Sequence, residues 1–243
     1  MKFLYPSSVN THKPLFVYIP GLDGSGELLA SQKQIWDLFD VRCVCLSLEK
    51  QDWQELTDEL ITLIKDELVS RSNQELYICG ESFGACLSLN LMASIPNLID
   101  RAILINSATP FRKRPLLTSG IYITAMMSDF VYQNSIFLLM PFLGKLSAIA
   151  PQQEKKLLEV IRKVPPSIVS WRLSLLQNFQ IPSLPDNPST LIIACSQDEL
   201  LPSTDEAHRL QKLLDNSQVK ILPESGHCCL LETPIDLWEI IKP

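Results

Sequence analysis

Residues 76–84 read Leu-Tyr-Ile-Cys-Gly-Glu-Ser-Phe-Gly, and an apolar segment follows them as far as Ala93. The run predicts a buried strand, a tight turn with Ser82 at its apex, and a helix. In this context a serine in the pattern G-x-S-x-G is a candidate nucleophile, because it stands on a sharp strand-to-helix turn. Gly80 and Gly84 leave room for the helix to pack against the strand. A serine in an ordinary strand-to-helix turn is the alternative interpretation.

The composition indicates a globular protein. Hydrophobic residues make up 46% of the 243 residues and charged residues 20%, which is enough apolar material for a sizeable core. The formal net charge of −6 argues against a nucleic-acid partner, which would favour a basic face. The first six residues contain no apolar signal-peptide core, and no uninterrupted apolar run approaches the length of a membrane span.

The seven cysteines fall mostly in apolar runs, and no C-x-x-C pair occurs. Free cysteine packs as a small hydrophobic residue, so we expect buried thiols in a reducing, cytoplasmic compartment rather than disulfides or a metal site. We expect no cofactor either. Cys228 and Cys229 directly follow a candidate catalytic histidine, and one of them could line its site.

Strand-like and helical segments alternate along most of the chain. Residues 27–39, for example, have the apolar spacing of a helix, and residues 203–206 match a capping box at a helix start. Such alternation predicts a mostly parallel sheet with helices on both faces. The glycine-rich loop at 21–26, Ser82 and Asn106 all follow strands, so they should meet at the carboxyl edge, where such sheets bind ligands.

Residues 110–187 break this alternation. Nine of the seventeen prolines fall between positions 110 and 188, and the stretch 121–143 is densely apolar, with Asp129 as its one charged residue. The prolines and the polar residues in mid-stretch argue against a membrane-spanning helix. We therefore predict one domain, with an α/β core over 1–109 and 188–243 and a helical cap over 110–187.

The apolar side chains of this cap have two interpretations. They can pack only against each other and the core, or some of them can line an apolar groove above Ser82. Methionine and phenylalanine adapt to flexible chains, so we name Phe130, Phe137 and Met140 as candidate substrate-binding residues. A bare apolar patch invites association, and we consider peripheral contact of the cap with a membrane surface.

One histidine lies where a catalytic base is expected. His227 stands in a glycine-marked loop after the last predicted strand, and Asp198 lies in the loop after the preceding strand. The chain order Ser82, Asp198, His227 is the Ser…Asp/Glu…His order of the α/β-hydrolases. Glu199 is the alternative acid, because it is the neighbouring carboxylate in the same loop.

These residues suit nucleophilic catalysis. His227 would take the proton of Ser82 Oγ, and Asp198 would hold the imidazole tautomer and stabilise the imidazolium. The backbone N–H groups of Leu22 and Phe83 would form an oxyanion hole. The plainer interpretation makes Asp198 a solvated loop acid and His227 an ordinary loop histidine.

Four segments of the chain carry a family resemblance: YIPGLDGSG at 18–26, FDVRC at 39–43, GESFG at 80–84 and DELLPS at 198–203. They resemble the hydrolase half of plastid phytyl ester synthases and their cyanobacterial relatives, an esterase/lipase/thioesterase group of α/β-hydrolases. The resemblance implies acyl-lipid chemistry, either hydrolysis of lipid esters or acyl transfer to a long-chain alcohol such as phytol or to diacylglycerol. The plant proteins also carry an acyltransferase domain with an H-x-x-x-x-D motif, and no histidine here has an aspartate five positions on.

The sequence thus predicts an α/β-hydrolase fold and a serine hydrolase that cleaves hydrophobic acyl esters or thioesters through an acyl-enzyme on Ser82. One alternative is an acyltransferase, and another is a catalytically silent hydrolase fold used for binding. The full set of candidate catalytic residues and the intact glycine loop favour the enzyme.

Overall fold

A seven-stranded sheet runs through the described part of the molecule. The computed structural model describes residues 1–144 and 146–242, so Lys145 and Pro243, which fall in the predicted cap and core, lie outside the described residues. The strand order is β1-β3-β2-β4-β5-β6-β7, with β1 antiparallel to β3 and the other neighbouring pairs parallel. The strands are β1 (Lys2–Leu4), β2 (Leu15–Ile19), β3 (Asp40–Cys45), β4 (Leu76–Glu81), β5 (Arg101–Ile105), β6 (Ser189–Cys195) and β7 (Ser217–Leu222).

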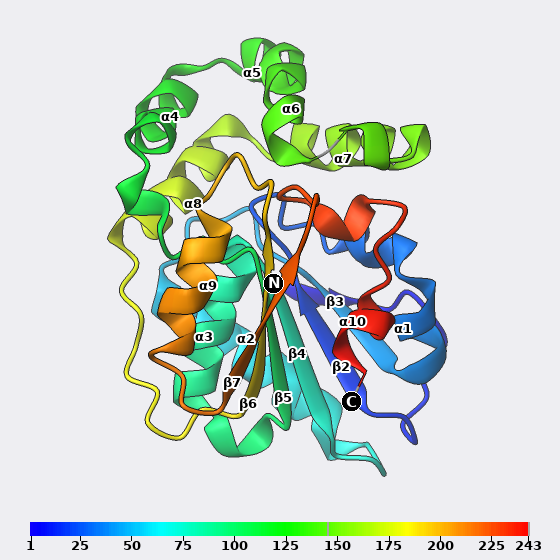
Figure 1. Ribbon diagram of the computed structural model, residues 1–243. Coiled ribbons are helices and arrows are strands. Elements are labelled where there is room, and N and C mark those ends of the chain that lie inside the picture. Colours follow the sequence, from blue (N-terminus) through cyan, green and yellow to red (C-terminus); the bar gives the residue numbers. More distant parts are fainter. Residues whose placement is uncertain (145, 243) are drawn as a thin grey trace.

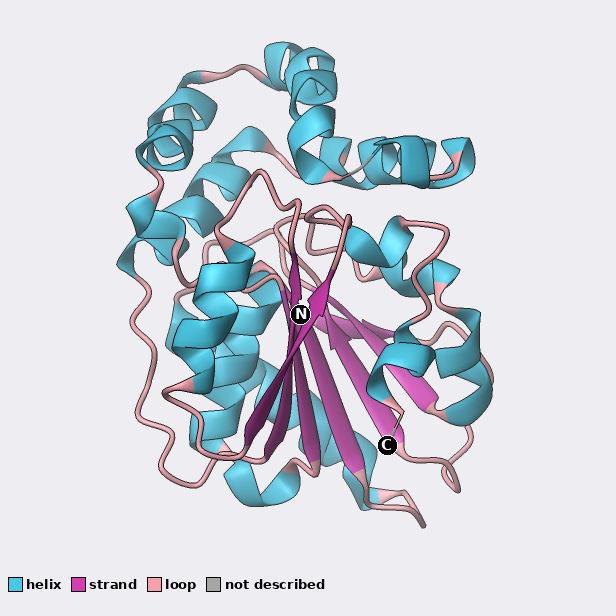
Figure 2. Cartoon of the chain, in the orientation of Figure 1, coloured by secondary structure: helices cyan, strands magenta, loops and turns pink. Residues whose placement is uncertain are grey.

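Helices cover both faces of the sheet (Figures 1 and 2). Alternate side chains of β2 point to opposite faces: Val17 packs with residues of α2 and α3, whereas Phe16 packs with residues of α1 and α10. Both side chains are fully buried, and such burial contributes about 1.5–3 kcal/mol for each. The predicted parallel sheet between two helical layers is therefore confirmed. The core helices are α1 (Lys33–Leu38), α2 (Trp53–Val69), α3 (Phe83–Ser94), α9 (Ser203–Gln211) and α10 (Leu237–Ile241).

The helix predicted over 27–39 is interrupted. Gln32 separates a short 3-10 helix, η1 (Glu27–Ser31), from α1. The buried amide of Gln32 donates to the Leu230 carbonyl at 2.7 Å and accepts from the Leu237 N–H at 2.7 Å. These bonds fix the C-terminal segment against this corner, and the backbone leaves the helical conformation at Gln32 to make them.

The capping box predicted at 203–206 is wrong. Helix α9 begins at Ser203 with Pro202 as its N-cap, and no side chain caps it. The Ser203 hydroxyl donates to the Asp198 carboxylate instead. Ser203, which the local pattern assigns to a helix cap, thus bonds to the preceding loop instead.

A helical segment lies between β5 and β6, above the carboxyl edge of the sheet (Figure 1). Two indole N–H groups connect its last helix to the core: Trp171 donates to the Gln51 carbonyl at 3.0 Å, and Trp53 donates to the Leu175 carbonyl at 3.1 Å. The division into a core and a cap at 110–187 stays a prediction. The helices are α4 (Pro115–Met126), α5 (Asp129–Ser135), α6 (Met140–Leu143), α7 (Pro151–Arg162) and α8 (Pro166–Asn178).

Among the described residues, not one helix combines the length and the apolar character that crossing a membrane requires.

Candidate active site

Ser82 occupies a strained turn between β4 and α3. Its φ of 53° lies in the left-handed region, where a non-glycine residue costs about 1–3 kcal/mol. The two flanking glycines explain how the turn fits: a Cβ on Gly80 would lie 2.4 Å from the Gly84 carbonyl oxygen, and one on Gly84 would lie 2.1 Å from the Ile19 carbonyl oxygen. The neighbouring backbone leaves no room for a side chain at position 80 or 84, so the turn can pack only with the glycines of the G-x-S-x-G pattern.

Ser82, His227 and Asp198 form one hydrogen-bonded series. The distance from His227 Nε2 to Ser82 Oγ is 3.0 Å, and that from His227 Nδ1 to Asp198 Oδ2 is 2.8 Å. A carboxylate only accepts, so Nδ1 carries the proton and Nε2 is free to accept from Ser82. Ser82 is 7% exposed and His227 is 5% exposed, whereas His208 lies exposed on α9.

The Asp198 carboxylate is held at both oxygens. Oδ1 accepts the backbone N–H groups of Leu200 and Leu201, each at 3.0 Å, and Oδ2 accepts from Ser203 and faces His227. Burial raises the pKa of Asp198. The charge and hydrogen bond of His227, together with these donors, lower it by more, so the net pKa is below its usual value. Asp198 is therefore ionised at neutral pH.

The alternative acid, Glu199, is exposed and contributes its backbone rather than its carboxylate. The Glu199 carbonyl accepts from Arg114 Nη2 at 2.9 Å. Of the two neighbouring carboxylates, Asp198 is the one that contacts His227.

The loop that carries His227 is fixed by two side chains. Asn106, at the end of β5, donates from Nδ2 to the His227 carbonyl at 2.7 Å and accepts from the Cys195 N–H at 2.9 Å. The buried Glu232 accepts from the Gly226 N–H at 2.8 Å. Sequence reasoning expected Asn106 at this edge but assigned it no role, and its φ of 44° has no signal in the sequence.

A second buried carboxyl group lies close to the histidine. Burial raises the pKa of Glu81 to about 7, against the opposing effects of a hydrogen bond from Tyr18 and the charge of His227. Burial lowers the pKa of His227, but the charge and hydrogen bond of Asp198 and the charge of Glu81 together raise it by more, so the net pKa lies above the usual value. The residue before the serine thus sets part of the electrostatic field at the candidate base.

The glycine-rich loop after β2 lies against the serine. A Cβ on Gly21 would be 3.7 Å from Ser82 Cβ, which places the adjoining Leu22 peptide beside the turn. Gly24 and Gly26 have φ values of 63° and 68°, a conformation that favours glycine. Leu22 of this loop packs against the apolar cluster that includes Phe83, the first residue of α3. The N–H groups of these two residues stay the predicted oxyanion donors.

The three predicted substrate-binding residues do not lie together. Phe130 is 77% exposed and Phe137 is 56% exposed, whereas Met140 is buried in an apolar cluster that includes Cys228. Because Cys228 directly follows His227, Met140 is the member of the three that packs near the candidate site. The other two point to the outside of the helical segment.

The chain is similar to known proteins in sequence and in fold. A sequence model of the alpha/beta hydrolase family matches residues 16–239. The chain belongs to that family. This hydrolase is also similar in structure to a thermophilic esterase from Thermogutta terrifontis (TM-score 0.76, 16% identity, covering 96% of this chain and 89% of that one). It resembles a lipase-esterase related protein from Clostridium acetobutylicum as well (TM-score 0.77, 17% identity, covering 96% and 94%). At these identities the likeness shows the fold.

Two curated relatives are chloroplastic proteins of Arabidopsis thaliana. The hydrolase is 28% identical to phytyl ester synthase 1 over 258 residues, which cover 94% of this chain and 36% of that protein. It is 27% identical to phytyl ester synthase 2, over 96% of this chain and 38% of that protein. The chain thus spans little more than a third of the length of these relatives.

The charges of Asp198 and Glu81 around His227 predict how the reaction rate depends on pH. A base must be neutral, so kcat/KM should fall as the pH drops through the raised pKa of His227. Glu81→Gln removes a negative charge that favours the imidazolium, and the acidic limb of the pH profile should move to lower pH. The exposed Glu199→Gln is the matched control and should leave the limb in place. An acidic limb that stays fixed in Glu81→Gln would contradict this coupling.

Proposed function

We propose that this hydrolase is a serine hydrolase of hydrophobic, lipid-like acyl esters or thioesters. The observation that carries the proposal is the series Ser82–His227–Asp198, with distances of 3.0 and 2.8 Å, at the carboxyl edge of the sheet. A catalytically silent binding protein needs neither a strained serine nor an ionised acid behind the histidine.

The reaction follows from the placement of these groups. Ser82 Oγ attacks the acyl carbon while His227 Nε2 takes its proton, and Asp198 stabilises the imidazolium. The oxygen of the tetrahedral intermediate accepts from the N–H groups of Leu22 and Phe83; losing one such donor typically costs about 2.7–4 kcal/mol. The leaving alkoxide or thiolate takes the proton from His227. An incoming hydroxyl then releases the acyl group by the reverse steps.

The incoming hydroxyl belongs to water in a hydrolase and to an alcohol in an acyltransferase. One observation favours the second candidate, the similarity to phytyl ester synthases. Transfer to a long-chain alcohol such as phytol, or to diacylglycerol, needs no further catalytic residue. Adding such an alcohol to the assay and identifying the ester by mass spectrometry distinguishes the two.

Loss of the nucleophile or the base tests the mechanism. Ser82→Ala should abolish turnover of a p-nitrophenyl ester and labelling by a fluorophosphonate, with an unchanged melting temperature. His227→Ala should lower kcat by about 10²–10⁴, the usual contribution of a general base. His208→Ala, on the exposed face of α9, is the matched control and should match wild type. Near-normal turnover by Ser82→Ala would rule out the proposed nucleophile.

The apolar cluster beside His227 predicts a preference for longer acyl chains. Met140 lies there with Leu28 and Cys228, and each buried methylene contributes up to about 0.8 kcal/mol. We expect kcat/KM to rise from C4 to C10 p-nitrophenyl esters, and Met140→Ala to flatten that rise. Phe137→Ala is the control, because its side chain is exposed. A maximum at C2–C4 with steady decline beyond would indicate a small-ester esterase.

The helical segment also has an outward apolar face, which we assign to contact with an anionic lipid surface. Figure 1 shows α4 and α5 on the side of the segment farthest from the sheet. Large hydrophobic side chains are exposed along them and in the 3-10 helix at Ile136–Leu139, and we call this set the outer face: Tyr122, Ile123, Met126, Phe130, Val131, Phe137 and Leu138. Exposed apolar patches mark interaction sites in soluble proteins.

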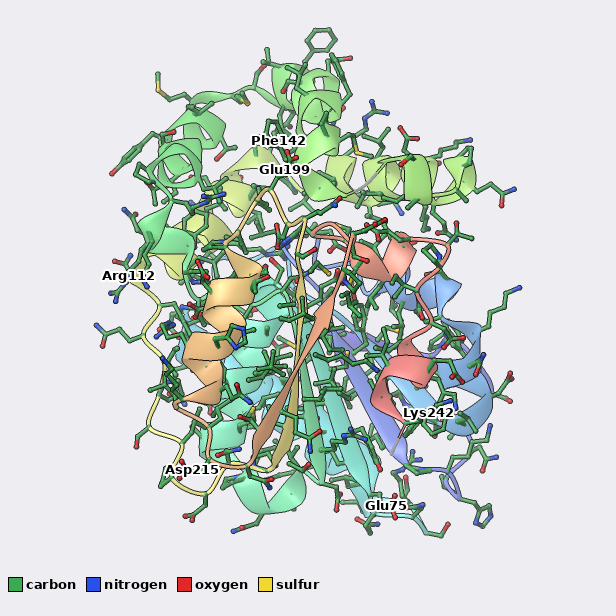
Figure 3. All side chains as sticks on the ribbon, in the orientation of Figure 1. Glu75, Arg112, Phe142, Glu199, Asp215 and Lys242 are labelled. Carbon is green, nitrogen blue, oxygen red and sulfur yellow. The ribbon has the colours of Figure 1, made fainter. Side chains whose placement is uncertain are left out.

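The charge distribution indicates what the outer face contacts. Residues 110–187 contain nine Lys and Arg and four Asp and Glu, although the whole chain contains 21 and 27. The segment is therefore basic on an acidic protein. Exposed Arg112 and Lys113 precede α4, and Figure 3 shows Arg112 at the edge of the molecule, at the base of the segment. Near an anionic bilayer each such residue contributes about 1 kcal/mol.

Vesicle flotation tests this contact. The hydrolase should float with vesicles that contain phosphatidylglycerol, bind pure phosphatidylcholine less, and lose binding as salt rises. Met126→Glu and Phe130→Glu should weaken flotation. Val69→Glu, at an equally exposed apolar position on α2, is the matched control. Self-association of the wild type that the two Glu variants abolish, without flotation, would assign the outer face to a second copy instead.

A further inference from the structure

A buried arginine of helix α8, Arg172, contacts the glycine-rich loop. Arg172 is 4% exposed, and its guanidinium donates from Nη1 to the Leu22 carbonyl at 2.8 Å and from Nη2 to the Ser47 carbonyl at 2.9 Å. One planar side chain therefore joins three segments: α8, the loop after β2, and the loop after β3. Arginine suits this position because its fork presents two donors in a fixed geometry.

The loop is shaped to receive this group. A Cβ on Gly24 would lie 2.5 Å from Arg172 Nη1 and 2.9 Å from Cζ, so the guanidinium occupies the space that a side chain would take. The loop closes on itself through the Gly24 N–H, which donates to the Gly21 carbonyl at 3.0 Å. Burial lowers the pKa of Arg172, and the charge of Asp23 in the same loop opposes that change.

The Leu22 carbonyl that Arg172 binds belongs to the residue whose N–H is the proposed oxyanion donor. From this geometry we infer that Arg172 is a positioning residue: by binding the Leu22 carbonyl, in the peptide that follows the donor N–H, it fixes the Leu22 backbone and so orients that N–H for the tetrahedral intermediate. The inference rests on the proposed function and adds a residue from the helical segment to it. Arg172 touches no reacting atom, and it acts through the loop alone.

The sequence position explains why no motif reveals this residue. Polar and apolar residues are mixed around helix α8, and an arginine in such a helix usually extends its charged head into water. Its burial depends on the loops at Leu22 and Ser47, which are distant in the chain.

Arg172→Lys tests the inference, because one ammonium group cannot reproduce a fork that bridges two carbonyls. A loop displaced by about 1 Å can cost about 10²-fold in rate, so we expect kcat to fall by about 10- to 100-fold with KM changed little. A boronic acid inhibitor forms a tetrahedral adduct on Ser82 whose oxygen needs the same donor. Its inhibition constant should rise by a similar factor.

Trp171→Phe is the matched control. It removes another hydrogen bond between α8 and the core, to the Gln51 carbonyl, from the residue next to Arg172. Both kcat and boronic acid binding should stay at wild-type values in this variant. Gly24→Ala displaces the guanidinium while Arg172 remains, and it should reproduce the loss if Arg172→Lys fails to fold.

The outcomes separate two failures. If the wild type neither hydrolyses esters nor binds the boronic acid, the proposed function is wrong, and the inference falls with it. If the wild type is active, and Arg172→Lys or Gly24→Ala keeps wild-type kcat and inhibitor binding with only a lower melting temperature, Arg172 is a structural connection and the inference alone is wrong.

Discussion

The left-handed backbone of Ser82 is the constraint on which the rest of the site depends. A φ of 53° at a serine is tolerated only because its neighbours leave it no alternative. The Ser82 N–H donates to the Ile105 carbonyl at 2.9 Å, and the Ser82 carbonyl accepts from the Ala85 and Ala108 N–H groups at 3.1 and 3.2 Å. Strand β5 and helix α3 therefore hold the turn from two sides, and the hydroxyl stands where the loops after β2, β6 and β7 meet.

The site is built from groups that serve two partners at once. Asp198 faces His227 with the same oxygen that accepts from Ser203, while its other oxygen receives two backbone N–H groups. Asn106 binds both the histidine loop and the end of β6. Such shared groups leave few conformations available, because moving one side chain breaks bonds on two elements. Preorganisation of this kind is what electrostatic stabilisation of a transition state requires.

The sequence predicted the parts of the site that depend on strand ends. Ser82, Asp198 and His227 each follow a strand, and a parallel sheet brings such positions to one edge whatever the details of the helices. The sequence could not predict which apolar side chains of the helical segment face outward and which face the core. Phe130 and Met140 have the same apolar character, yet one faces outward and the other inward, because that choice depends on how α5 and α6 pack. The roles of Gln32 and Arg172 depend on partners far along the chain, so local patterns missed them. Ser203 was misassigned because its hydroxyl bonds Asp198 in the preceding loop and not the end of its own helix.

The helical segment leaves β5 and returns at β6, which are hydrogen-bonded neighbours with Ile105 opposite Ile193. Because the two strands are parallel, the segment begins at the carboxyl edge of the sheet, after Ile105, and ends at the opposite edge, before Ser189, and the sheet fixes both ends. Closing a longer loop between fixed ends costs only about 0.6 kcal/mol for each doubling of length. Insertion or exchange of helices at this point leaves strand register and the serine turn untouched. Substrate preference can thus diverge within such a lineage by exchange of the helices that precede α8, while α8, whose Arg172 bonds the Leu22 loop, and the catalytic residues are retained.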